Sequence, residues 1–304
     1  PILDEDNFLM ALDQDIFVRR RDMGRGARWS ISSQAMFPLR SVPPTHNNAF
    51  RPGSLYDLSE SANHIRKKAL VPANSTDPVG DWLNQHAAIL KTLITAANRP
   101  GTRFPADPNA PLFEQPIPAF VNLRATAQTF ALRTQRAIEH RDAVTAVEGL
   151  RVIQQLRRSM ESSPTLVAAM IGVAICAMEA NLIQDGIQRG LWSDTQLERF
   201  QSQLAGSDLI QLLENSMALE IIHQVTVIEH HGLLKSFNAS AKHSIFERAV
   251  PRGWIQQMNA YSANLSMDAL LHAIDAGRHR IHFERFEESD RRLEEFDKSM
   301  CFFH

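Results

Sequence analysis

Residues 164 to 179 read PTLVAAMIGVAICAME, and no charged residue interrupts the chain between Glu161 and Glu179. A proline is favourable in the first turn of a helix, and the two serines before it can cap that turn. A helix that spans a bilayer needs about 20 apolar residues, which is more than this run offers. The stretch therefore predicts a buried central helix against which the other helices pack.

The segment before this run predicts a helical hairpin. Residues 119–140 and 142–160 both repeat apolar residues at helical spacing, and only a short turn joins them. The pair resembles a tetratricopeptide unit, because large and small apolar residues alternate on its inner faces. No second copy follows at the repeat length of about 34 residues, so the hairpin is repeat-like without forming a periodic array.

The segment after the run predicts two more helices with defined ends. The central helix is expected to continue to Arg189 and to close at Gly190, because glycine favours the left-handed residue after a helix. Ser193 is expected to cap the next helix, and Gln196 completes a capping box. Residues 208–231 predict a second long core helix.

Upstream of the hairpin, Asp77 and Pro78 predict the start of a helix that ends near Asn98. His86 falls on the apolar face of that helix. We interpret it as a core histidine bonded to a carbonyl rather than a metal ligand, since no second ligand follows four residues later.

Composition sets the class. The 304 residues contain 32 Lys and Arg against 34 Asp and Glu, a formal charge of -2, so no global field favours nucleic acid or anionic lipid. Two cysteines form no disulfide framework. Few alternating runs of β-branched residues occur, and sheet is expected to be minor. We predict an all-α fold of antiparallel helical hairpins packed as a bundle or short repeat-like superhelix. Residues 1–118 are expected to form an irregular, Pro-rich N-terminal lead with two or three short helices packed on the body, and 119–304 the helical domain.

Glu220 and His223 are the candidate metal ligands. Their i, i+3 spacing places a carboxylate and an imidazole on one helical face, as in carboxylate-bridged di-iron bundles. A matching second Glu-x-x-His is missing from the sequence, although Glu148 and Glu179 on neighbouring helices could supply further carboxylates.

Other chemistry finds little support in the sequence. His279 and His282 could grip zinc from one face, but no third ligand is specified, and solvated side chains are the simpler interpretation. The chain has no Gly-x-Ser-x-Gly elbow and no Gly-rich phosphate loop. Cys176 lies among alanines and is expected to be inert. We therefore predict no catalytic residue and no cofactor.

Several segments, in order, resemble a family of uncharacterised bacterial helical proteins that carry an N-terminal signal or membrane anchor. The matching segments are PILDEDNF (1–8), TRFP (102–105), LRTQRAIEHRDAVTAVEGLRVIQQLRRSM (132–160), SPTLVAAMIGVAI (163–175), LWSDTQLERFQSQL (191–204) and PRGWIQQMNAY (251–261). The resemblance implies a periplasmic or membrane-anchored, extracytoplasmic helical domain, with any anchor ahead of Pro1. It implies no catalytic residue, and residues 18–53 and the charged tail after 283 lie outside it.

Three functional hypotheses follow. The leading one is a non-catalytic helical scaffold or protein-protein interaction domain with a protein partner, no nucleic acid, and contact with a membrane only through a segment absent from this chain. The second is a helical-bundle metalloprotein or enzyme that uses Glu220 and His223. The third is a subunit of a larger assembly that contacts its neighbours through its termini.

Overall fold

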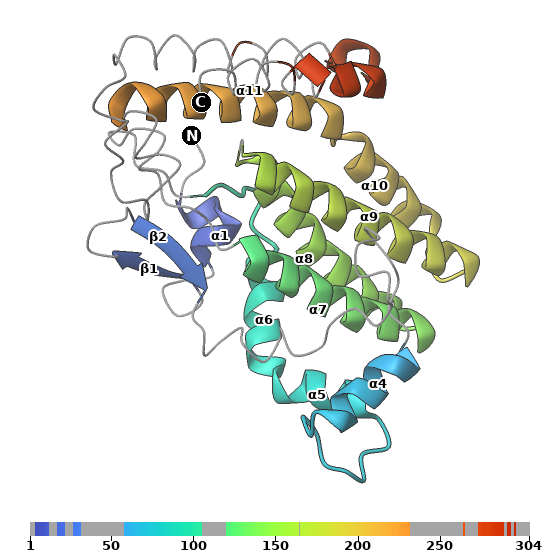
Figure 1. Ribbon diagram of the computed structural model, residues 1–304. Helices are drawn as coiled ribbons and strands as arrows, with labels where there is room; N and C mark the ends of the chain where they lie inside the picture. Colours follow the sequence, from blue (N-terminus) through green and yellow to red (C-terminus); the bar gives the residue numbers. More distant parts are fainter. Residues whose placement is uncertain are drawn as a thin grey trace. The chain divides into compact units, whose positions relative to one another are not determined.

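The structure is a computed structural model, and it describes residues 4–11, 17–21, 27–31, 58–104, 120–163, 165–231, 264, 273–288, 291, 292 and 295. Contacts divide the chain into two units. The first comprises Pro1–Asn109, Glu114–Ser163 and Val167–Ser207, and the second Ala110–Phe113, Pro164–Leu166 and Asp208–His304. The described residues are predominantly helical, which confirms the all-α prediction (Figure 1). The division predicted at residue 118 stays a prediction.

The first unit contains most of the helices. Its described elements are the 3-10 turn η1 (Asp4–Asp6), α1 (Phe8–Ala11), β1 (Phe17–Arg21), β2 (Ala27–Ile31), α4 (Leu58–Lys67), α5 (Pro78–Gln85), α6 (Ala87–Ala96), α7 (Phe120–Glu139), α8 (Ala143–Glu161), α9 (Leu166–Gln188) and α10 (Asp194–Ala205). Helices α7 and α8 form the predicted antiparallel hairpin, and they are the most closely packed pair of helices described.

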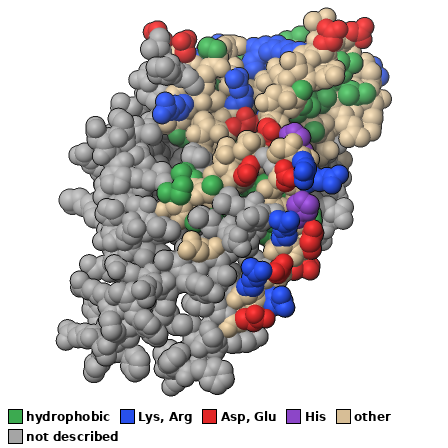
Figure 2. Space-filling model, turned by 90° about the horizontal axis from the view of Figure 1, so that it is seen from above, with side chains coloured by type: hydrophobic (Ala, Val, Ile, Leu, Met, Phe, Trp, Pro, Cys, Tyr) green, Lys and Arg blue, Asp and Glu red, His purple; other side chains and the backbone are tan. Residues whose placement is uncertain are grey.

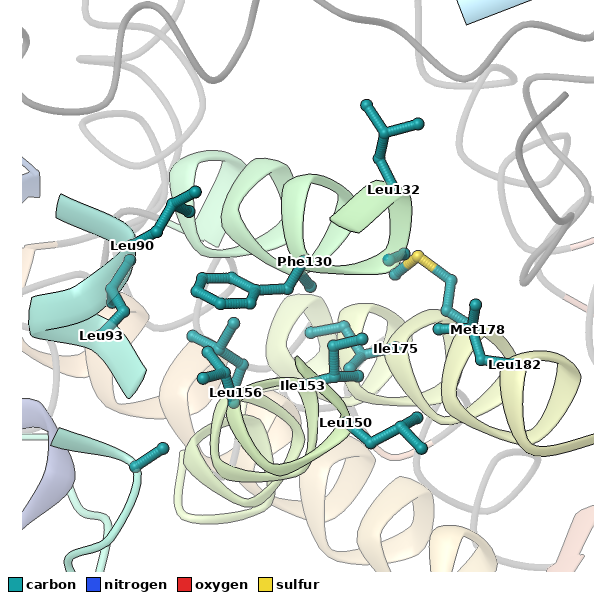
Figure 3. Close-up of a cluster of buried hydrophobic side chains, with 14 of the residues drawn as sticks. Leu90, Leu93, Phe130, Leu132, Leu150, Ile153, Leu156, Ile175, Met178 and Leu182 are labelled. Atoms are coloured by element: carbon teal, nitrogen blue, oxygen red, sulfur yellow. The ribbon is translucent and has the colours of Figure 1, made fainter. Parts of the chain in front are cut away.

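The core of this unit lies among α6, α7, α8 and α9. Figure 3 shows its centre, where Phe130 of α7 points toward Leu156 of α8 and toward the leucines of α6, and Ile175 of α9 closes the other side. All are buried. Gly149 of α8 packs so tightly on the side chain of Thr134 of α7 that a Cβ would overlap it. The hairpin therefore depends on a small residue at this crossing.

Three helices of this unit end with the same hydrogen-bond pattern. In each, the residue after the cap is left-handed: Ala69 (φ 51°) after α4, Arg141 (φ 58°) after α7 and Gly190 (φ 61°) after α9. After α9, the N–H of Leu191 donates to Gly186 and that of Gly190 to Ile187, a Schellman motif. The prediction for Gly190 is confirmed, as is the capping box of Ser193 on α10.

The helix predicted from 77 to 98 is correct in its start but is interrupted. Asp77 accepts the N–H of Gly80 at the expected N-cap. At His86, however, the helix divides into α5 and α6. The imidazole Nδ1 lies 2.7 Å from the carbonyl of Trp82, the acceptor that the backbone N–H of His86 would use in a continuous helix. That N–H bonds Leu83 instead. The prediction of a carbonyl-bonded histidine is thus confirmed, and the same bond explains the break.

Two predictions for α9 need correction. The helix exists and extends to Gln188, but it is buried on one face only: large apolar residues on its other face are exposed. Ser162 does not cap its start, because Ser162 is the C-cap of α8 and its hydroxyl donates to the carbonyl of Ser159.

The described part of the N-terminal lead packs on the same unit. Asn7 pairs with Gly101 in a parallel bridge. Its side-chain amide donates a hydrogen bond to the carbonyl of Arg103 and accepts one from the N–H of Arg103. Phe8 is fully buried beside it. The lead is also less irregular than predicted, since β1 and β2 pair antiparallel with Arg19 opposite Trp29. Valine, phenylalanine and tryptophan in these runs favour strand.

The second unit has fewer described residues. It contains α11 (Leu209–His231), which matches the predicted second long helix, and the short strands β3 (Ile274–Asp275) and β4 (Arg280–Ile281), joined by the 3-10 turn η5 (Ala276–Arg278). The two strands pair antiparallel, and β3 and η5 contact α11. The charged tail after residue 283 lies only partly within the described residues.

Candidate functional site

Helix α9 carries only two charged side chains, Glu179 and Asp185, and both are buried. Because an unpaired buried charge is strongly unfavourable, each needs a partner. Asp185 accepts the side-chain amide of Gln135 from α7 at 2.9 Å and the Nε of Arg189, the residue that follows α9, at 3.0 Å. Glu179 is paired with Arg157 of α8. The buried face of α9 therefore carries two charged side chains, and each is hydrogen-bonded to a neighbouring helix.

The guanidinium of Arg157 is the centre of the larger network and is 1% exposed. Its Nε donates to Glu179 at 2.8 Å, its Nη1 to Glu161 at 2.6 Å, and its Nη2 to the carbonyl of Gln203 at 3.4 Å. The same Glu161 oxygen accepts the hydroxyl of Ser207 at 2.6 Å. The network thus joins α8 to α9, to α10 through Gln203, and to Ser207, which lies two residues after α10.

One guanidinium faces two carboxylates, so the cluster carries a net negative charge when both are ionised. Burial raises the pKa of Glu179 above its ordinary value of 4.5, although the charge and hydrogen bond of Arg157 oppose this shift. Burial acts to lower the pKa of Arg157, but Glu179 and Glu161 together raise it. The guanidinium of Arg157 therefore stays protonated. Burial opposes the ionised form of Glu179, the more deeply buried of the two carboxylates.

This network is suited to holding helices together rather than to catalysis. All three nitrogens of the Arg157 guanidinium already donate hydrogen bonds. Cys176 lies within electrostatic range of it, yet burial raises the pKa of the Cys176 thiol. A thiol with a raised pKa is a poor nucleophile, because the thiolate is the reactive form.

The predicted metal ligands lie on α11. Glu220 is half-buried, and the side chain of His223 is outside the described residues. The carboxylates that could have joined them are engaged with arginines: Glu148 accepts Arg133 at 2.9 Å, and Glu179 accepts Arg157. Among the described side chains, no group of three or more His, Cys, Asp or Glu could hold a metal ion. The Glu220 and His223 site stays a prediction.

His279 and His282 contact different carboxylates. His279 Nδ1 lies 3.8 Å from Asp208, and His282 Nδ1 lies 3.2 Å from Glu284. Each histidine thus has an acidic neighbour of its own. The His279 side chain is largely solvated, as the simpler interpretation of the sequence expects, whereas that of His282 is half-buried.

The outer face of α9 exposes large apolar side chains. Met170 is 63% exposed, Ile187 53% and Val173 38%. We use the name α9 seam for the row Met170, Val173, Ala177, Ala180, Gln184 and Ile187. In the described part of the chain, α9 is also the one helix long and apolar enough to cross a membrane, with a mean hydropathy of 2.1 over a window that is 44% buried. The seam is therefore an uncharged surface on a helix whose other face is fixed to the core.

Charge elsewhere is mixed. Figure 2 shows acidic and basic side chains close to one another over the described part of the face that it draws. The described ion pairs include Arg291 with Glu295 and Arg292 with Glu288. Such exposed pairs contribute little to stability and leave little net field where opposite charges lie close together.

Comparison of the chain with protein-family models, with curated proteins and with solved structures found no match. The geometry of the described residues therefore carries the functional argument.

Sequence reasoning missed both features of α9. The seam could have been found from the spacing of Met170, Val173 and Ile187 on one face, had the helix not been treated as buried all round. Arg157 follows the buried Ile153 by one turn of α8. An arginine in the apolar register of a helix is a signal for a buried acidic partner.

Proposed function

We propose that this chain is a non-catalytic helical scaffold that binds a protein partner through the α9 seam. The exposed seam is the observation that carries the proposal. This row of uncharged side chains, with the large apolar residues Met170, Val173 and Ile187 exposed on a helix that buried charges anchor, favours a binding surface, since exposed apolar patches mark interaction sites.

The closed charge network supports the same proposal. The buried groups of Arg157 and Glu179 bond to each other and hold α9 against α8. This supports the proposal because a binding surface needs a rigid support. The sequence resemblance adds a location: we propose that the domain is periplasmic or membrane-anchored and extracytoplasmic, with a tetratricopeptide-like hairpin as its centre and any anchor in a segment outside this chain.

Assembly through the N-terminus has less support. Residues Asp6, Asn7 and Phe8 are bound to the chain's own residues 99 to 103. That part of the lead is therefore occupied within its own unit and does not favour contact with a neighbouring subunit.

The test is site-specific photocrosslinking in a bacterium that expresses the full chain. A photoreactive amino acid replaces Met170 in one variant and Val144, an equally apolar residue that is 72% exposed at the start of α8, in the control. We expect a crosslinked protein from position 170 and none from position 144. Crosslinks of equal yield from both positions, or none from position 170, contradict the proposal.

A further inference from the structure

The α9 seam has the spacing of a coiled-coil surface. Its six residues, Met170, Val173, Ala177, Ala180, Gln184 and Ile187, follow one another at intervals of 3, 4, 3, 4 and 3 residues. This alternation is the a/d pattern of a heptad repeat, in which each side chain fits between four residues of a facing helix. The described structure places no charge on this row, so the seam fits a second helix along its length.

The seam is complementary to itself when two copies run antiparallel. In an antiparallel pair each a position faces a d position of the partner. This rule brings Met170 opposite Ile187 at both ends, Val173 opposite Gln184, and Ala177 opposite Ala180 on either side of the two-fold axis. Large residues therefore meet at the ends. The alanines at the centre let the two helix axes approach to the usual distance of about 8 to 10 Å.

Charge favours the same arrangement. Helix α9 has no acidic residue in its first turn, so its own side chains leave the positive end of the helix dipole uncompensated, whereas Arg189 follows its last residue. In an antiparallel pair, the positive end of each dipole lies beside the negative end of the other. A parallel pair would place like ends together.

The size of the seam limits the strength of this contact. The 23 residues of α9 extend about 34 Å. A single pair of helices of that length covers less than the roughly 800 Å² per partner of a standard stable interface. A dimer held by the seam alone is expected to be weak and concentration-dependent, with a Kd in the micromolar range or above.

We propose that two copies of this chain associate through the α9 seam as an antiparallel helix pair with two-fold symmetry. This inference rests on the proposed function, because it names the partner of the same surface: a second copy of the chain.

The pairing is tested by placing opposite charges at positions 170 and 187, which face each other across the proposed dimer. The variants are Met170→Glu, Ile187→Lys and the double variant, with Val144→Glu as the control at an exposed apolar position outside the seam. Within one copy the two substituted positions are about 25 Å apart, so they cannot pair in the monomer. Both are exposed, and circular dichroism checks that helicity is unchanged.

Sedimentation velocity of the full chain is measured from about 1 µM to about 1 mM. We expect the unaltered chain and Val144→Glu to dimerise with the same Kd. Each single variant should weaken dimerisation at least about 100-fold, because an apolar contact is lost twice. The double variant should recover most of that loss, since each glutamate then faces a lysine of the other copy.

Three outcomes overturn the inference. The chain is monomeric at every concentration, or the double variant dimerises no better than the single ones, or the chain floats with neutral phosphatidylcholine vesicles as a monomer, which would assign the seam to lipid. A monomeric chain that still crosslinks another protein from position 170 would overturn this inference and leave the proposed function standing. A chain that neither dimerises nor gives a crosslink from position 170 contradicts both this inference and the proposed function.

Discussion

Replacing Glu179 by glutamine should stabilise the protein at neutral pH, although the change removes a buried ion pair. The reason is the charge count of the cluster: one guanidinium, Arg157, is bonded to two carboxylates, Glu179 and Glu161. Glutamine at 179 leaves a neutral Arg157–Glu161 pair and retains an acceptor for Nε. The buried group that is lost is the one whose charge burial opposes.

The pH dependence gives the magnitude. Because the folded state raises the pKa of Glu179 above 4.5, the folded chain binds more protons than the unfolded chain between pH 4.5 and the folded pKa. Stability is therefore lost as pH rises from 4.5 through the folded pKa, at up to about 1.4 kcal/mol per pH unit. The glutamine variant lacks this loss. The two proteins should be about equally stable near pH 4.5, with the variant gaining relative to the parent as pH rises.

Arg157→Met provides the contrast. It leaves two carboxylates without a cation and should cost roughly 3 to 5 kcal/mol near pH 7. Unfolding in urea, followed by tryptophan fluorescence in a background with Trp29 and Trp254 replaced by phenylalanine, reports on the first unit through Trp82 and Trp192. A glutamine variant that is 3 kcal/mol or more less stable than the parent near pH 7, with no pH-dependent difference, would refute the reasoning.

The remaining predictions concern the caps, the hairpin crossing and the metal hypothesis. Arg141→Gly should raise the free energy of unfolding by up to about 1 kcal/mol and Gly190→Ala should lower it by about 1 kcal/mol, because both positions have positive φ; a urea titration that gives the same sign for both disagrees with this. Gly149→Ala should cost about 1 to 3 kcal/mol, and Thr134→Ala in the same chain should recover part of that loss, as thermal unfolding would show; strict additivity speaks against the close contact. Metal analysis of the purified chain should find less than one equivalent bound, and His223→Ala should leave the melting temperature unchanged; a stoichiometric metal that His223→Ala removes would instead support the metalloprotein hypothesis.

Local signals predicted the helix boundaries well. Asp77 with Pro78, and Ser193 with Gln196, act through hydrogen bonds within a few residues, so their effect does not depend on the rest of the fold. His86 shows the limit of such reasoning. Its bond to a carbonyl was predicted, but that the same bond would divide the helix depends on the rotamer of the side chain, which packing against Trp82 selects.

Strand pairing was harder to predict. Residues 17 to 31 contain two short runs with β-branched and aromatic residues, yet arginines interrupt both. A two-stranded pair carries a weak pattern, because few side chains alternate between buried and exposed faces.

The sequence alone determined that the chain is helical, where most helices begin and end, and that α7 and α8 form a hairpin, because periodicity, caps and a short turn are local properties. Only the tertiary structure decided which face of α9 is buried. An uncharged run gives no sidedness to a helix by itself. The direction was set by Arg157 and Gln135 on neighbouring helices, which draw Glu179 and Asp185 inward and leave the seam outside.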